Sequence, residues 1–156
     1  MLLFIAHGRR ELVHVAVTAR PAAAWVWRQF VEATPWGRQP THLIRDCDAV
    51  YGGGFRGRAQ ALGVETVLTP VRAPRANAVA ERMIGSIRRG CLDHVIPLDE
   101  AHLRAVLAEY LAYYNHERPH RTLRLDTPVP AARSPTGAVH VRRVLGGLHH
   151  TYARAA

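Results

Sequence analysis

Two acidic residues, Asp46 and Glu81, stand in settings that could serve phosphoryl-transfer chemistry. Asp46 closes a predicted strand, His42 to Asp46, and Glu81 lies in a predicted helix that begins near Ala78. Carboxylates suit the hard ions Mg²⁺ and Mn²⁺, and two such ions about 3.5–4 Å apart can stabilise the attacking and leaving oxygens of a phosphodiester reaction. The 34 residues between Asp46 and Glu81 allow the carboxylates to meet, but two ions normally require a third. A turn-forming aspartate and a solvated helix glutamate are the ordinary alternatives.

The residues around Glu81 favour a polyanionic partner. The segment from Thr69 to Asn77 is predicted to be a stiff basic loop, because it contains two prolines and two arginines. The whole chain has a net charge of +9, with 21 basic against 12 acidic residues, and a sequence pI near 10.9. Every basic residue is arginine, which suits bidentate phosphate contacts and also accompanies GC-rich coding sequence. The expected DNA contacts are Arg72, Arg75, Asn77, Arg82 and Arg88.

Hydrophobic periodicity predicts a mixed α/β domain that positions these residues. A hairpin is expected from Leu2 to Thr18, with Val13, Val15 and Val17 on one face of its second strand. Ala80, Ile84, Ile87 and Cys91 form an apolar helical stripe, so Glu81 is expected to point away from the core. Further helices are predicted from Ala22 to Ala33, from Phe55 to Leu62, and from an N-cap at Asp99 to Arg118, with strands at 42–46, 64–68 and 139–144.

Three blocks of the sequence resemble the integrase core of bacterial insertion-sequence transposases. The first runs from Leu43 to Gly52 (LIRDCDAVYG), the second from Thr69 to Arg82, and the third from Tyr113 to His120 (YYNHERPH), with Thr127-Pro128 as the usual ending. The order of the blocks is that of the family. The resemblance covers roughly residues 2–130 and identifies the chain as a member of the retroviral-integrase-like family.

The resemblance implies a ribonuclease H-like mixed sheet flanked by helices. It makes Asp46 and Glu81 the second and third members of an Asp-Asp-Glu triad that binds Mg²⁺ or Mn²⁺ as a two-metal site. The implied reaction is hydrolysis and strand transfer of DNA phosphodiesters. The implied partners are double-stranded DNA, namely element ends and target, and a second copy of the chain or a full-length transposase.

The first aspartate of the triad has no counterpart in this sequence. In the family it lies on a first strand upstream of Leu2, and no acidic residue precedes Glu11 here. Glu11 falls at a hairpin edge and is a poor replacement, and Asp48 is expected to be a solvated loop residue rather than a ligand. Because the first strand of such a fold lies centrally, between the second and the fourth, two sheet pieces with unpaired inner edges are expected.

The sequence divides into a partial catalytic core, residues 1–130, and a basic tail, residues 131–156, with a possible short strand and an otherwise loose course. Three functions compete: a metal-dependent recombination enzyme, a non-catalytic remnant that binds DNA or a transposase, and a ribonuclease H-like nuclease. The apolar run Leu2 to Ala6 is too short for a signal peptide or a membrane span, so a bacterial cytoplasmic protein is expected.

Several other residues are expected to be structural. Cys47 and Cys91 show no metal-binding or disulfide spacing, and the adjacent His149 and His150 are not a predicted zinc site. His120 is expected to support the chain after Pro119. Packing roles are predicted for Trp25, Trp27, Trp36, Tyr113 and Tyr114.

Overall fold

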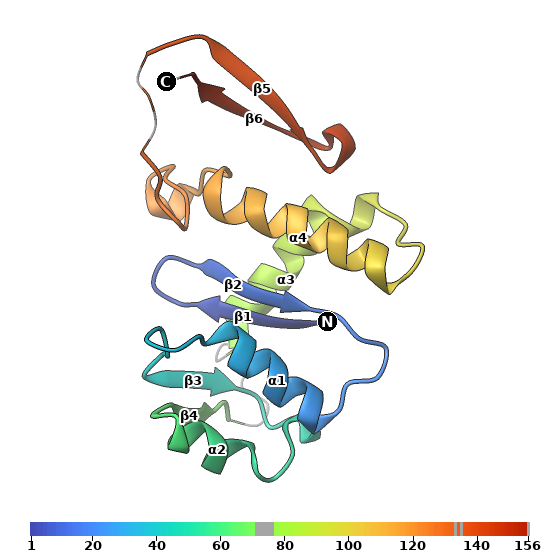
Figure 1. Cartoon of the computed structure of the whole chain (residues 1–156), viewed down its shortest axis with the longest axis vertical. Helices are drawn as coiled ribbons and strands as arrows, with labels where there is room; N and C mark the ends of the chain where they lie inside the picture. Colours follow the sequence, from blue (N-terminus) through green and yellow to red (C-terminus); the bar gives the residue numbers. More distant parts are fainter. Residues whose placement is uncertain (71–76, 133, 135, 156) are drawn as a thin grey trace.

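From Leu2 to His116, strands and helices follow one another in the order that the hydrophobic pattern predicts (Figure 1). The computed structural model describes residues 1–70, 77–132, 134 and 136–155. Short 3₁₀ turns lie at Ala49–Tyr51, Leu92–His94, Arg121–Leu123 and Leu145–Gly147. The main elements are β1 (Leu2–Ala6), β2 (Glu11–Ala16), α1 (Ala23–Ala33), β3 (His42–Arg45), α2 (Phe55–Ala61), β4 (Glu65–Leu68), α3 (Ala78–Gly90), α4 (Glu100–His116), β5 (Val139–Val144) and β6 (His149–Arg154).

The strands of the described residues form three separate pairs. Strands β1 and β2 are antiparallel, β3 and β4 are parallel, and β5 and β6 are antiparallel. Among the described strands, β1 has no partner on the edge away from β2, and β3 has none on the edge away from β4. A cavity of about 590 Å³ lies between these two edges, with residues of both strands in its wall. The predicted pair of unpaired inner edges is therefore present.

Strand β1 separates two apolar cores. Its odd-numbered side chains, Leu3 and Ile5, pack against a cluster from β2, α3 and α4 that is centred on Ile87 and Tyr110. Its even-numbered side chains pack against a second cluster, from α1, α2 and the start of β4. This alternation is the ordinary two-residue period of a strand with both faces covered. Figure 1 accordingly shows β1 and β2 between α1 and α4.

A β-bulge changes the faces of β2. The register pairs Phe4 with His14 and Ile5 with Leu12, so Val13 has no direct partner. The extra residue places Leu12, which was not predicted to be buried, in the core with Val15 and Val17, where Leu12 is only 1% exposed. Val13 is 39% exposed and lines both the cavity between the sheet pieces and a smaller pocket that it shares with Val15 and Val17.

The helices confirm most of the predicted packing, with two corrections. Asp99 caps α4 by accepting a hydrogen bond from the backbone of His102 at 2.7 Å. In α3 the stripe is shifted, since Met83 is buried with Ile87 while Ile84 is 40% exposed. Trp36, predicted to pack, is 92% exposed because it lies beyond the end of α1 in the turn before β3.

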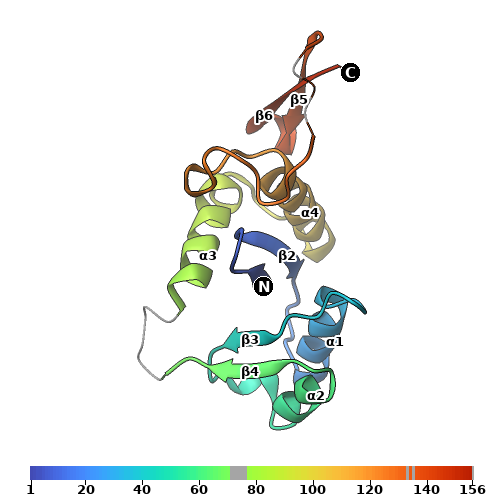
Figure 2. The ribbon, with the colours of Figure 1, turned by 90° about the vertical axis from the view of Figure 1, so that its left-hand side faces the viewer.

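The C-terminal residues form a hairpin, whereas one strand and a loose tail were predicted. Strand β6 pairs with β5 from Val139–Arg154 to Val144–His149. The hairpin is attached to the body near its turn, where Val144 is fully buried and the His149 ring stacks on Tyr113 with centroids 4.6 Å apart. Figure 2 shows the strands extending from this attachment away from α4. Among the described residues, no helix has both the length and the apolar character needed to cross a membrane.

Candidate active site

Asp46 lies directly after β3, as predicted, at the end where β3 and β4 finish together. Its Oδ1 accepts a 3.4 Å hydrogen bond from the backbone N–H of Asp48, so the carboxylate begins a tight turn. Asp48 is committed to that turn as well, because its Oδ1 accepts a 2.9 Å hydrogen bond from Val50 N–H and caps the following 3₁₀ turn. Asp48 is thus the N-cap of the Ala49–Tyr51 turn.

Arg45 holds the backbone around Asp46, and sequence reasoning did not single it out. Its Nη1 donates to the Asp46 carbonyl at 2.8 Å, and its guanidinium lies 4.4 Å from the centre of the Tyr51 ring. Burial, followed by the charge of Asp46, raises the pKa of Tyr51 to about 12, so the phenol stays protonated at neutral pH. In the sequence, the role of Arg45 is indicated only by its position next to an aspartate that ends a strand.

Glu81 lies in the first turn of α3 and is exposed, as predicted. Arg82, Arg88 and Arg89 are also exposed on this helix, and Arg88 Nε lies 3.5 Å from Asp93 Oδ1. At Gly85, one turn after Glu81, a Cβ would lie only 3.0 Å from Arg89 Nη1. Arg89, which the sequence analysis omitted, therefore covers the surface one turn after Glu81.

The cavity between the sheet pieces connects the neighbourhoods of the two carboxylates. Its wall includes Ile44 and Arg45, which precede Asp46, and Val79 and Ala80, which precede Glu81. Much of the remaining wall comes from β1, including Leu3 and Ile5, and from the end of α1 and the segment that connects it to β3. Asp46 and Glu81 thus follow residues of two different elements that line the same cavity. Two other predicted DNA contacts, Arg72 and Arg75, lie outside the described residues, and Asn77 lies at the cavity wall.

The carboxylate oxygens of Asp46 and Glu81 are the kind of ligand that a hard divalent ion prefers, but two carboxylates are too few for a two-ion centre. The described residues contain no group of three or more His, Cys, Asp or Glu side chains that could hold a metal. Glu11 pairs with Ala6 at the turn end of the β1–β2 hairpin. A two-ion centre needs more oxygen ligands than Asp46 and Glu81 provide.

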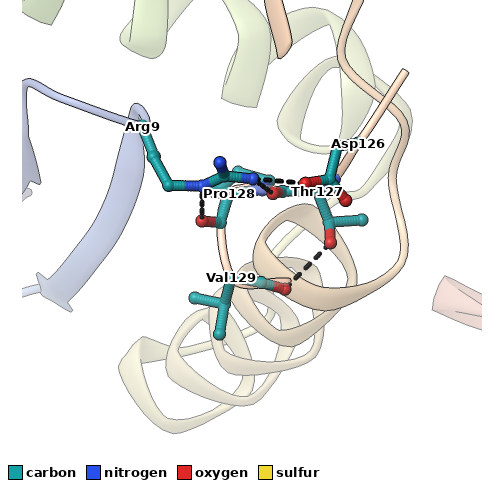
Figure 3. Close-up of polar contacts among 5 residues, drawn as sticks. All are labelled: Arg9, Asp126, Thr127, Pro128 and Val129. Atoms are coloured by element: carbon teal, nitrogen blue, oxygen red, sulfur yellow. Dashed lines mark hydrogen bonds and ion pairs between the residues drawn. The ribbon is translucent and has the colours of Figure 1, made fainter. Parts of the chain in front are cut away.

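The third sequence block, Tyr113 to His120, connects the end of α4 to the β1–β2 hairpin. Asn115 hydrogen bonds to both backbone groups of Leu12, at 3.0 and 2.9 Å. His120 Nε2 lies 3.3 Å from the Tyr114 carbonyl, as expected of a residue that supports this turn. Figure 3 shows a second connection to the hairpin, in which Arg9 contacts the Thr127-Pro128 ending. Its guanidinium donates to Asp126 Oδ2 at 2.5 Å and to the carbonyls of Thr127 and Pro128 at 2.7 and 2.8 Å.

Comparisons with known proteins agree with this arrangement. Residues 62–128 match the family model described as an integrase core domain. The chain is 32% identical, over 116 residues, to the insertion element IS476 uncharacterized 39.2 kDa protein of Xanthomonas euvesicatoria. That match covers 71% of this chain and 32% of the relative, so the chain spans about a third of the relative's length.

A solved structure is similar across almost the whole chain. It is a chain of the simian T-cell lymphotropic virus intasome in complex with PP2A regulatory subunit B56 gamma. The TM-score is 0.65 at 15% identity, over 98% of this chain and 59% of that chain. The mixed α/β fold is thus of the ribonuclease H-like class that the sequence predicts. The two sequence matches place residues 62–128 in the integrase core family and make the chain similar to a protein of an insertion element.

Proposed function

We propose that this chain serves DNA transposition, with Asp46 and Glu81 as two of three carboxylates that hold Mg²⁺ or Mn²⁺ for phosphodiester hydrolysis and strand transfer. The observation that carries the proposal is the cavity whose wall includes the residues just before each carboxylate. Arg45 supports it, because a guanidinium bonded to the Asp46 carbonyl fixes the turn that presents this carboxylate. Bound ions of this kind would stabilise the attacking and leaving oxygens of the DNA backbone.

The third carboxylate is proposed to arrive on a strand that occupies the cavity. Such a strand would pair with the free edges of β1 and β3 and join the two sheet pieces. A length of about five residues, roughly 17 Å, would match β1. Its side chains would meet both cores, since Leu3 and Ile5 of β1 face one cluster while Leu2 and Phe4 face the other.

The DNA is proposed to lie along the exposed surface of α3. Arg82 and Arg88, which follow Glu81 on the same helix, would bind backbone phosphates, together with Arg72, Arg75 and Asn77 from the preceding segment. These are sequence-independent contacts, so they set the position of the duplex and leave the choice of sequence to other residues. The protein is further proposed to act in the bacterial cytoplasm, with a second copy or a full-length transposase when two DNA ends are brought together.

Nicking of supercoiled plasmid in Mn²⁺ tests the catalytic proposal. Two forms are assayed: the 156-residue chain, and a longer protein that also includes the residues encoded in frame before Met1. We expect nicking by the longer form, a loss of about 10³-fold or more in D46N and E81Q, and little change in D48N, since Asp48 only caps a turn. Nicking that survives E81Q would overturn the proposal.

The non-catalytic alternative is favoured by one observation, the lack of a third ligand among the described residues. Under that alternative both forms bind duplex DNA in a salt-sensitive, sequence-indifferent manner, and neither nicks plasmid in Mn²⁺. Cleavage of RNA in an RNA–DNA hybrid, again abolished in E81Q, would instead assign the chain to the nucleases.

A further inference from the structure

The β5–β6 hairpin has one face that nothing in the described structure covers. Its register places Val139 opposite Arg154, Val141 opposite Tyr152 and Arg143 opposite His150. Because side chains two residues apart point to the same side of a strand, these six residues share one face. Val139, Val141 and Tyr152 are 53%, 57% and 69% exposed. We call this surface the open hairpin face.

The opposite face of the hairpin is the one that attaches it to the body. Val144 is fully buried, and His149 Nε2 lies 2.6 Å from the carbonyl oxygen of Gly90. Arg142, also on this side, forms an ion pair with Glu117 just beyond α4. The hairpin is therefore held in a fixed orientation, with the open hairpin face turned away from the elements that anchor it.

The charge of the hairpin is of one sign. From Thr127 to Ala156 the sequence has no Asp or Glu and four arginines. Arg142 is paired with Glu117. Arg143 and Arg154 are exposed on the open hairpin face, and Arg154 donates a 3.0 Å hydrogen bond to the Gly137 carbonyl. A flat surface with two arginines, a histidine, an exposed tyrosine and no acid complements a polyanion.

We propose that the open hairpin face binds the backbone of duplex DNA. Arg143 and Arg154 would each bind a phosphate, while the Tyr152 hydroxyl donates to a third and the two valines lie against deoxyribose. This inference rests on the proposed DNA function of the chain but concerns a different surface. In Figure 1 the hairpin lies at the end of the molecule opposite β3 and β4, so it adds a second contact remote from Asp46.

The face suits DNA better than another protein surface. A stable protein interface of ordinary size needs about 800 Å² from each partner, with a well-packed apolar centre. The open hairpin face offers only two valines and one tyrosine as apolar groups, and arginines flank them at both ends. Phosphate recognition needs no such centre, because its affinity comes mainly from charge and the release of counterions.

Equilibrium binding of the full chain to a 30-base-pair duplex at several salt concentrations tests the inference. The variant R143Q/R154Q removes two charges from the open hairpin face. The matched control R28Q/R56Q removes two from exposed positions on α1 and α2. We expect R143Q/R154Q to weaken binding about tenfold and to reduce the slope of log K against log salt by about 2, with little change in the control. Circular dichroism confirms that both variants are folded.

The outcomes separate this inference from the proposed function. If the chain binds the duplex and both double variants bind equally well, the open hairpin face is not a DNA contact. If R143Q/R154Q leaves DNA affinity unchanged but abolishes self-association, the occupant is a second copy and the inference is overturned. If R82Q/R88Q loses affinity in the same assay while R143Q/R154Q does not, the α3 surface survives and the hairpin proposal fails.

Discussion

The side-chain amide of Asn115 forms both backbone hydrogen bonds of Leu12. Leu12 N–H donates to Asn115 Oδ1 at 3.0 Å, and Asn115 Nδ2 donates to the Leu12 carbonyl at 2.9 Å. The amide thereby takes the place of a neighbouring strand at one residue of β2, and both groups are buried. It connects α4 to a position 103 residues earlier in the chain.

Asn115→Leu is expected to lower the free energy of unfolding by about 2–4 kcal/mol. The leucine fills a similar volume but leaves a buried N–H and a buried carbonyl of Leu12 without partners. Urea denaturation followed by circular dichroism measures the change. His116→Ala is the matched control, since His116 is the next residue of α4 and is exposed. Equal stabilities of the two variants would show that the amide pairing is not needed.

Arg9 is expected to stabilise the chain through the shape of its guanidinium rather than its charge alone. Its three hydrogen bonds to Asp126, Thr127 and Pro128 use two different nitrogen atoms. Arg9→Lys keeps the charge but cannot form this fork, so we expect a loss of about 1 kcal/mol in the same urea experiment. Arg20→Gln, at an exposed position, should change stability by less. A lysine variant as stable as the parent would contradict the role of the fork.

The free edges of β1 and β3 are expected to cause concentration-dependent aggregation. Ile44 is 47% exposed and lines the cavity between them, so Ile44→Lys places a charge where a second chain would add a strand. Light scattering should show aggregation beginning at a higher protein concentration in this variant. Leu62→Lys is the control, because Leu62 is also exposed but follows α2, away from both edges. Equal improvement in both would mean that net charge, rather than the edges, sets solubility.

The two cysteines are expected to differ sharply in reactivity. Cys47 is exposed, whereas Cys91 is buried, and burial raises the pKa of the Cys91 thiol to about 11. One thiol per native chain should therefore react with a thiol reagent at pH 8, and a second only after unfolding. Rapid reaction of both thiols in the native chain would contradict the burial of Cys91.

The same pKa gives a pH dependence of stability. The folded-state pKa of Cys91 lies above that of an unfolded thiol, near 8.5, so the neutral thiol favours the folded state. That contribution is fully present below about pH 8.5 and is lost as the pH rises towards 11. The free energy of unfolding, measured by urea denaturation between pH 8 and 10, should therefore decline less steeply with pH in Cys91→Ala than in the parent.

The fold was largely predictable where one periodicity ran without interruption. The hairpin from Leu2, the helix ending at Ala33 and the N-cap at Asp99 were all predicted and are present. The burial of Leu12 was not, because a single extra residue in β2 interrupts the alternation and leaves no mark in composition. The β6 strand was missed, because its histidines, threonine and alanine form no alternating apolar pattern.

The candidate site was predictable in its parts but not in its assembly. Asp46 and Glu81 lie at the ends of the elements to which they were assigned, and both remain proposals as catalytic residues. Arg45 could not be recognised in advance, because its role depends on the Tyr51 ring, which only the turn after β3 brings near. The tertiary contact, rather than the residue type, defines that role.

The two apolar cores on either side of β1 have a thermodynamic consequence. Asp46 follows β3, whose Leu43 packs on one core, whereas Glu81 belongs to the helix that supplies Met83 and Ile87 to the other. Each core can lose its order with its own free energy, so the distance between the carboxylates depends on how cooperatively the two cores fold. A ligand bound to both carboxylates would bind only when both cores are ordered, and its affinity would therefore report their coupling.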